Sequence, residues 1–200
     1  MTVAHEYADL ATVKAMLNLA DADATSDALL TQALGAASRG IERLTGRRFW
    51  LDPAPVQRVY SLTGRVAADD DGDRLVVDDI GALDGLAVET GSGATWSPVT
   101  GYLTAPDNAH LDGAPITSLV LPSGRWGTRG TRVRVTARFG WPAVPVEVAQ
   151  AAQIQALRLY RRKDSPDGVT GSAEWGVVRL SRVDPDVAAL VERLQLPGMG

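Results

Sequence analysis

The sequence predicts an α+β fold in which a small helical bundle carries an inserted antiparallel β-module. Apolar residues recur with a helical period near the start of the chain and again over 145–163. Between these segments, short runs with a two-residue period alternate with Gly, Pro and Asp. We therefore divide the chain into N-terminal helices (1–46), a β-rich module (47–140), a long helix within 141–167 and a C-terminal arm, short helix and tail (168–200).

Composition is that of an ordinary globular protein and excludes several classes. The 200 residues are 45% hydrophobic and 22% charged, with a net charge of −4, which argues against a basic nucleic-acid binder. Cysteine is absent, so disulfides, thiolate catalysis and Cys-based zinc sites are excluded. No stretch approaches the roughly 18 consecutive apolar residues of a membrane span, and the first residues do not form a signal peptide.

Two helices are expected at the N-terminus. Asp9 is placed to cap a short first helix, and Thr25 or Ser26 to cap a longer one that ends at Gly46. The second helix is amphipathic, and one side carries Leu29, Leu30, Ala33, Leu34, Ala37, Ile41 and Leu44. Gly35 and Gly40 each cost about 1 kcal/mol of helix propensity relative to Ala, so we expect another backbone to pack closely against them.

Six short β-type runs follow, separated by turn residues, and predict a small antiparallel β-sandwich or barrel-like module. "RLVVDDI" and "GLAVET" are read as two of these runs. In the last run, Val133, Val135 and Ala137 alternate with Arg132, Arg134, Thr136 and Arg138. This alternation predicts one buried face and one arginine-rich face.

The chain returns to helix after Pro142 and Pro145, and Pro145 suits a first helical position. Alanines on its apolar face allow close approach, so we expect this long helix to pack against the second helix. A β-hairpin arm over 168–180 and a short helix after Asp184-Pro185 follow, and the last residues from Leu196 are expected to be a mobile tail.

The acidic run at 69–79 has some of the residues of a calcium-binding loop. With Gly72 at the sixth place of an EF-hand loop, the first place is Ala67 and the twelfth is Asp78, where Glu is wanted. Strands are expected on both sides, so a solvated hairpin turn is the preferred interpretation. The other acidic run, 21–27, is more simply a helix cap, and neither run is expected to hold a metal.

The sequence contains no enzymatic motif. His5 and His110 have no partner of a known catalytic or zinc pattern, and there is no nucleophile elbow, P-loop or dinucleotide fingerprint. We expect no catalytic residue and no cofactor. A small metal enzyme that uses the acidic run is a remote alternative.

Arginine clusters leave three interpretations open. Arg158, Arg161 and Arg162 end the long helix, where they complement the helix dipole or form a contact patch. Arg132 and Arg134 permit the same two interpretations. A third is that these arginines meet the acidic residues Asp71 and Asp73 of an identical copy around a ring.

Two apolar residues of the long helix, Ile154 and Leu157, lie beside Arg158 and Arg161 on its polar side. Apolar residues in that position favour a partner surface there. The candidate interface residues are Ile154, Leu157, Arg158, Arg161, Arg162, Arg132, Arg134, Asp71 and Asp73.

Three blocks of the sequence resemble the head–tail adaptor (connector) proteins of long-tailed bacteriophages. The first resembles their two opening helices at Tyr7, Leu10, Lys14, Leu17, Ile41, Glu42, Gly46, Arg47 and Phe49. The second is "FGWPAVPVEVAQAAQIQALRLYRRKDSPDG", and the third is "LSRVDPDVAALVERL". The resemblance covers both ends of the chain well and residues 50–130 poorly.

This resemblance implies a structural virion protein. Such proteins form a ring, expected here to be a dodecamer, between the portal protein and the head-closure (stopper) or tail-terminator protein. The ring extends the channel through which genomic DNA passes without sequence-specific binding. The implied location is the neck of the virion, after assembly in the bacterial host cytoplasm and with no membrane involved, and residues 168–200 would become ordered on docking. The alternative is a tail-terminator or tail-completion protein, or another non-catalytic β-rich interaction module.

Overall fold

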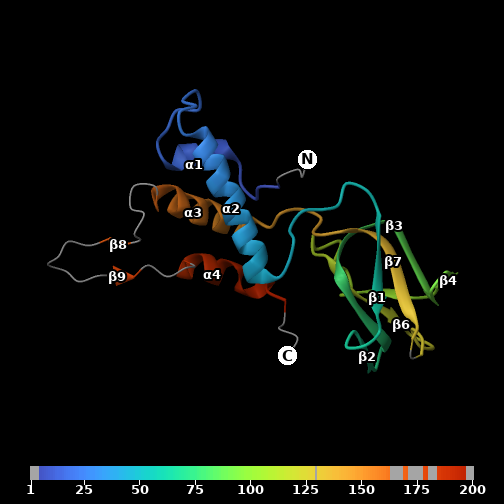
Figure 1. The fold of residues 1–200 in the computed structure, drawn as a ribbon. Coiled ribbons are helices and arrows are strands. Elements are labelled where there is room, and N and C mark those ends of the chain that lie inside the picture. Colours follow the sequence, from blue (N-terminus) through green and yellow to red (C-terminus); the bar gives the residue numbers. More distant parts are fainter. Residues whose placement is uncertain (1–4, 129, 163–168, 171–177, 180–183, 197–200) are drawn as a thin grey trace. The chain divides into compact units, whose positions relative to one another are not determined.

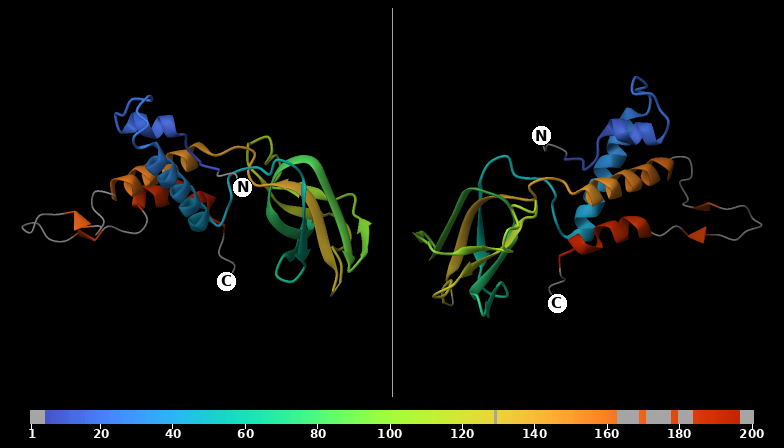
Figure 2. Two further views of the ribbon diagram at one scale, coloured as in Figure 1. Left: turned by 45° about the horizontal axis from the view of Figure 1, so that its top comes forward. Right: turned by 180° about the vertical axis from the view of Figure 1, so that it is seen from behind.

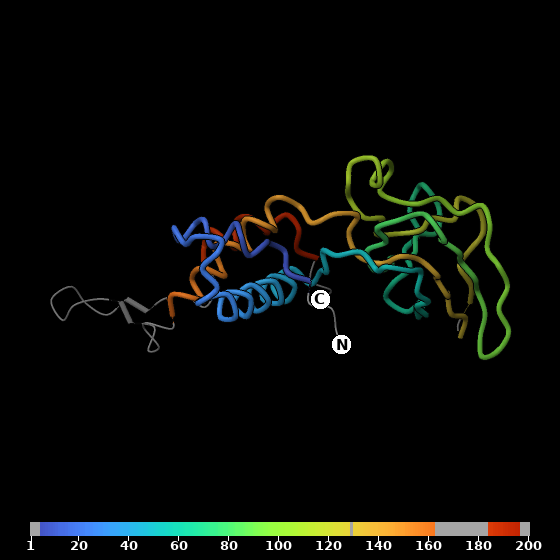
Figure 3. Tube along the Cα trace, turned by 90° about the horizontal axis from the view of Figure 1, so that it is seen from above, coloured from blue at the N-terminus to red at the C-terminus, as the bar shows by residue number. Residues whose placement is uncertain are grey.

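The structure, a computed structural model, describes residues 5–128, 130–162, 169–170, 178–179 and 184–196. It confirms the α+β class, with α-helices and a seven-stranded antiparallel sheet (Figure 1). The chain forms two compact units, one made of Met1–Arg47 with Val144–Gly200 and the other of Arg48–Ala143. The chain passes from the helical unit into the β-unit and returns once, as Figure 3 shows.

The two N-terminal helices have the predicted boundaries. Helix α1 (Leu10–Met16) is capped by Asp9, whose carboxylate accepts a 2.7 Å hydrogen bond from the Thr12 N–H. Helix α2 (Asp27–Thr45) begins after Ser26 and ends at Gly46, which has a φ of 69°. The Ser26 side chain does not cap the helix, because its hydroxyl is hydrogen-bonded to the Tyr160 hydroxyl at 2.8 Å.

Helix α3 (Val146–Arg161) is slightly shorter than predicted, and Pro145 is its N-cap rather than a first helical residue. It packs against α2 as expected. Ala156 of α3 belongs to the same buried cluster as Val13 of α1 and Leu30 and Leu34 of α2. This cluster is the core of the helical unit.

One expectation for α2 is wrong, and a second is not met by the described residues of this chain. Leu29 is 50% exposed, although the helical pattern placed it on the buried side. A Cβ atom added at Gly35 would have no neighbour within 4 Å, and one at Gly40 would meet only the Arg43 Nη2 atom at 3.9 Å. Apart from α2 itself, no backbone of the described residues comes within 4 Å of a Cβ atom built at either glycine.

The C-terminal region contains helix α4 (Pro185–Val191), which is capped by Asp184, and the 3₁₀ turn η2 (Glu192–Leu194). Leu196 is not part of a free tail, since its N–H donates a 2.8 Å hydrogen bond to the Thr45 carbonyl. Of the predicted arm, strands β8 (Val169–Thr170) and β9 (Val178–Arg179) pair with each other. The rest of the arm and residues 197–200 lie outside the described residues.

The β-unit contains seven strands that form a single sheet. In chain order they are β1 (Val56–Ser61), β2 (Val66–Asp69), β3 (Gly72–Ser92), β4 (Thr95–Pro98), β5 (Leu103–Ala105), β6 (Ile116–Leu121) and β7 (Arg132–Phe139). The prediction that "RLVVDDI" and "GLAVET" are separate strands is wrong, because both belong to the 21-residue β3.

Strand β3 bends and holds the sheet together. Its first part pairs with β2 and β6, its second part pairs with β4 and β7, and the register shifts between Val76 and Ala87. The bend requires close approach at Gly81, where a Cβ atom would lie 2.7 Å from the Gly140 carbonyl oxygen. The sheet therefore curls over one core, to which Leu75 and Leu119 contribute from one half and Val88 and Val133 from the other (Figure 2).

The alternation predicted for β7 is confirmed. Val133, Val135 and Ala137 are completely buried, and the arginines between them point away from the core. None of the helices in the described ranges has the length and apolar character needed to cross a membrane.

Candidate functional site

The candidate residues on α3 differ in how deeply they are buried and in the contacts they make within their own chain. Leu157 is half-buried and packs against the core cluster of the helical unit, and Ile154 is also half-buried. The Arg158 Nη1 atom lies 3.0 Å from the Asp184 Oδ2 atom, with both side chains mostly buried. Because Asp184 also caps α4, this ion pair ties α3 to α4. Arg158 is therefore part of the scaffold.

The last two arginines of this group lie at the C-terminal end of α3. Arg161 is exposed and forms no ion pair with any described residue, whereas Arg162, the C-cap, is half-buried. Both complement the negative end of the helix dipole. Of the two, Arg161 presents its charge to solvent.

The two candidate arginines of β7, Arg132 and Arg134, also differ in their contacts. Arg134 donates two 2.7 Å hydrogen bonds to the Glu89 carboxylate, and its guanidinium carbon lies 4.4 Å from the centre of the Trp96 ring. The hydrogen bonds lower the pKa of Glu89 and raise the pKa of Arg134. Arg132, at the start of β7, is exposed and has no ion-pair partner among the described residues.

Within the acidic run, Asp70 and Asp71 form the turn between β2 and β3, as the hairpin interpretation predicted, while Asp69 ends β2 and the rest of the run lies in β3. The Arg74 Nε atom lies 2.6 Å from the Asp69 Oδ2 atom, and its Nη2 atom lies 3.3 Å from the Asp71 Oδ2 atom. The hydrogen bond from Arg74 lowers the pKa of Asp69. Across the described residues, no group of three or more His, Cys, Asp or Glu side chains is arranged to hold a metal ion.

Asp73 has a structural role that the sequence did not reveal. Its carboxylate accepts a 3.0 Å hydrogen bond from the Trp126 N–H, and its carbonyl accepts a 2.7 Å bond from the indole Nε1–H. Trp126 is only 1% exposed and belongs to the core of the β-unit. Asp73 therefore anchors the loop between β6 and β7, whereas Asp71 remains exposed at the turn.

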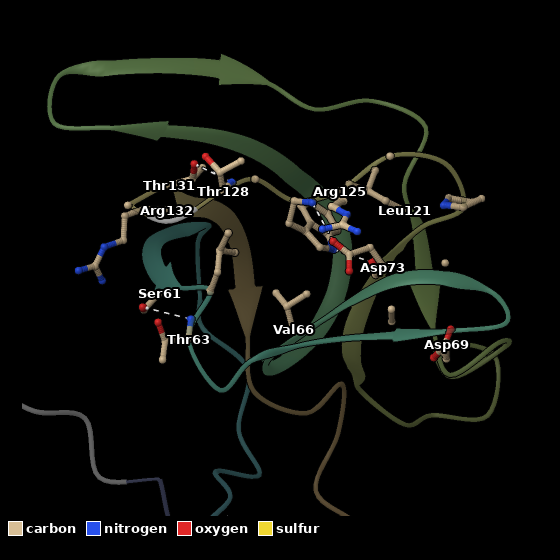
Figure 4. A pocket seen from close by; sticks show the side chains of 18 residues that line it. Ser61, Thr63, Val66, Asp69, Asp73, Leu121, Arg125, Thr128, Thr131 and Arg132 are labelled. Carbon is tan, nitrogen blue, oxygen red and sulfur yellow. Dashed lines mark hydrogen bonds between the residues drawn. The ribbon is translucent and has the colours of Figure 1, made fainter.

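A broad hollow of about 1180 Å³ lies between this loop and the β2–β3 hairpin (Figure 4). Arg125, Thr128 and Thr131 of the loop line one part of it, and Val66 and Asp69 line another. The Thr131 hydroxyl accepts a hydrogen bond from the Thr128 N–H, so it closes a turn. The described lining residues include no His or Cys that could serve as a general base or nucleophile.

The N-terminal segment is held on α2 by residues that match the adaptor resemblance. The Tyr7 hydroxyl donates to the Glu42 carboxylate, and the Tyr7 N–H donates to the Ser38 hydroxyl at 3.0 Å. Lys14 is 3% exposed, and its Nζ atom lies 2.9 Å from the Asp27 Oδ1 atom. Tyr7, Glu42 and Lys14 thus stabilise the helical unit.

A second, smaller hollow was not predicted. It is a groove of about 230 Å³ between α2 and α3, lined by Leu29, Gln32, Ala33, Ala36, Leu159 and Tyr160. Most of the lining side chains are apolar, and Leu29 is half exposed. In the sequence, the one feature that points to this groove is the run of small residues before Gly40 in α2.

No model of a protein family matches the sequence, and no protein of curated function matches it. Solved structures do match. The chain is similar to one in "Neck of empty GTA particle computed with C6 symmetry", with 23% identity and a TM-score of 0.54 over 100% of this chain and 96% of the other. It is also similar to one in "Virion of native gene transfer agent (GTA) particle", with 21% identity and a TM-score of 0.52 over 95% of this chain and 90% of the other. These likenesses show a shared fold.

Proposed function

We propose that this chain is a structural component of the neck of a tailed, phage-like particle. It forms a ring between the portal protein and the head-closure or tail proteins, and the ring extends the DNA channel. The observation that carries the proposal is the fold shared, over the whole chain and through both units, with a chain of a gene transfer agent neck.

The contacts of the helical unit support the adaptor class within this role. Positions that match the adaptor pattern are in contact with each other, as in the Tyr7–Glu42 hydrogen bond. Of the other matching positions, Gly46 ends α2, and Lys14 joins α1 to α2 through its ion pair with Asp27. The resemblance therefore rests on residues that build this unit and not on scattered surface positions.

The electrostatics of the chain suit a channel through which DNA moves. A wall that binds phosphates through many free cations releases counterions and holds DNA tightly. Here Arg134 and Arg158 are occupied by carboxylates of their own chain, and the net charge is −4. In a ring, a chain with this charge balance would hold DNA weakly enough to let it pass.

The test is mass photometry of the full chain, alone and mixed with the portal protein of the same particle. We expect either a ring of about twelve times the 21.2 kDa chain mass or a portal complex that gains as many copies. A 21.2 kDa species that ignores the portal would refute the proposal. Binding to the tail tube protein instead of the portal would replace the adaptor role with that of a tail terminator.

A further inference from the structure

We infer that copies of this chain join head to tail through the two ends of α3, with Val146 of one copy seated in the groove between α2 and α3 of the next. This inference rests on the proposed ring and names the contact that closes it. Four observations on the described residues of the helical unit carry it: an open apolar groove, a glycine without a close neighbour, an exposed apolar residue and two opposite charges outside any ion pair.

The groove is preformed and partly empty. Leu29, Ala33 and Ala36 of α2 form one wall, and Leu159 and Tyr160 of α3 form the other. Leu29 is 50% exposed at its edge. A concave surface lined by apolar side chains is the kind of site into which an apolar side chain of a partner packs.

Gly40 extends the α2 wall of the groove. Leu29, Ala33, Ala36 and Gly40 follow the i, i+4, i+7, i+11 spacing of one helix face. A glycine in a helix is less stable than alanine, and nothing in the described part of the chain requires one at position 40. A second chain that approaches this face closely explains the residue.

Val146 is the residue that matches the groove. It is 79% exposed, more than any other large apolar side chain in the described residues of the helical unit. It lies thirteen residues before Leu159 on the same helix, so the apolar residue and the groove are about 20 Å apart along α3. Val146 cannot reach the groove of its own chain, which leaves a second copy as the occupant.

Charges at the two ends of α3 are complementary. Glu147 follows Val146, and Arg161 follows Tyr160 of the groove. Both side chains are exposed, and neither forms an ion pair with a described residue. When Val146 enters the groove of a neighbour, Glu147 is brought to the end of the helix that carries Arg161 of that neighbour.

Such a contact is heterologous, because the two surfaces that meet are different. Repetition of a heterologous contact gives a closed ring when the rotation between copies closes, and an open filament when it does not. A pair contact between like surfaces would give only a dimer. Head-to-tail contact through α3 therefore accounts for a ring of one kind of chain.

Disulfide mapping tests the contact directly, because the chain contains no cysteine. Val146→Cys and Gln32→Cys variants of the full chain are mixed under the conditions in which mass photometry shows assembly, then oxidised. A covalent dimer is expected in the mixture and none in either variant alone. The double variant should give a ladder of higher multiples. The matched control is a mixture of Val146→Cys with Thr31→Cys, in which the substituted residue is exposed on another side of α2. This mixture should form no disulfide-linked dimer.

A charge exchange gives an independent readout. Glu147→Arg and Arg161→Glu should each reduce assembly, and the two substitutions together in one chain should restore it. Unchanged circular dichroism is expected throughout, because both residues are exposed.

Each outcome separates this inference from the proposed function. Rings that form in the mixture of Val146→Cys and Gln32→Cys variants without a disulfide between the two substituted positions overturn the α3 contact and leave the neck role standing. Links in the single variants as strong as in the mixture also overturn it, because they indicate contact between like surfaces. A chain that never assembles, alone or with the portal, overturns both.

Discussion

Gly35→Ala should stabilise the helical unit, although alanine makes no new contact there. Gly35 lies in the middle of α2, and a Cβ atom at this position would have no neighbour within 4 Å. The substitution therefore brings no clash and removes backbone freedom from the unfolded chain. The expected gain is the propensity difference between Gly and Ala, about 1 kcal/mol.

This gain is measurable by urea denaturation followed by far-ultraviolet circular dichroism, which mainly reports the helices. With a slope of about 1–3 kcal/mol per molar urea, the midpoint should rise by about 0.3–1 M. Gly46→Ala is the matched control on the same helix. Its φ of 69° strains an L-residue, so the same substitution should lower the midpoint by a similar amount.

Opposite signs for the two substitutions would support the geometry of α2. A lower midpoint for Gly35→Ala would refute the reasoning, because it would show that another surface covers Gly35 in the free protein. An equal rise for both variants would show that the left-handed cap at Gly46 does not form in solution.

Two further predictions concern the β-unit. Arg134 lowers the pKa of Glu89, so the stability from this pair is complete above the ordinary pKa of a glutamate and is lost as the pH falls through the lowered value. Glu89→Gln should therefore lower the denaturation midpoint at neutral pH, with the difference vanishing at a pH that protonates Glu89 in the native state. Asp73→Ala removes the charged acceptor of the Trp126 N–H and should cost about 1–3 kcal/mol in urea denaturation, whereas Asp73→Asn, which keeps an acceptor oxygen, should cost less.

Local features of the fold could be predicted because local chemistry decides them. Asp9 caps α1 through its own carboxylate, and Gly46 ends α2 because it accepts a left-handed conformation. The continuity of β3 could not be predicted in this way. Asp84-Gly85 is typical of a turn, but pairing with β7 on both sides of it keeps the segment in one strand with a shift of register. Pairing between distant strands therefore decided what the local sequence left open.

The candidate site was less predictable because its charges are neutralised at long range. Arg134 binds a carboxylate 45 positions away, and Arg158 binds one 26 positions away. No local pattern separates these arginines from Arg161, which has no ion-pair partner among the described residues. The width of a buried helix face also depends on the neighbour, and this is why Leu29 is exposed.

The distribution of free charge favours apolar contact over charge as the main source of affinity between copies. Of the candidate arginines, Arg134 and Arg158 already have carboxylate partners, and the acidic turn, which one of the three interpretations paired with the arginines of a neighbouring copy, is partly neutralised by Arg74. A ring held only by exposed ion pairs would be weak, because such pairs contribute about 0–1 kcal/mol each and are screened by salt. An apolar residue as exposed as Val146 gains more from burial, about 1.5–3 kcal/mol for a complete valine-sized side chain. The charges on α3 would then set the direction of the contact, and the groove would supply most of its affinity.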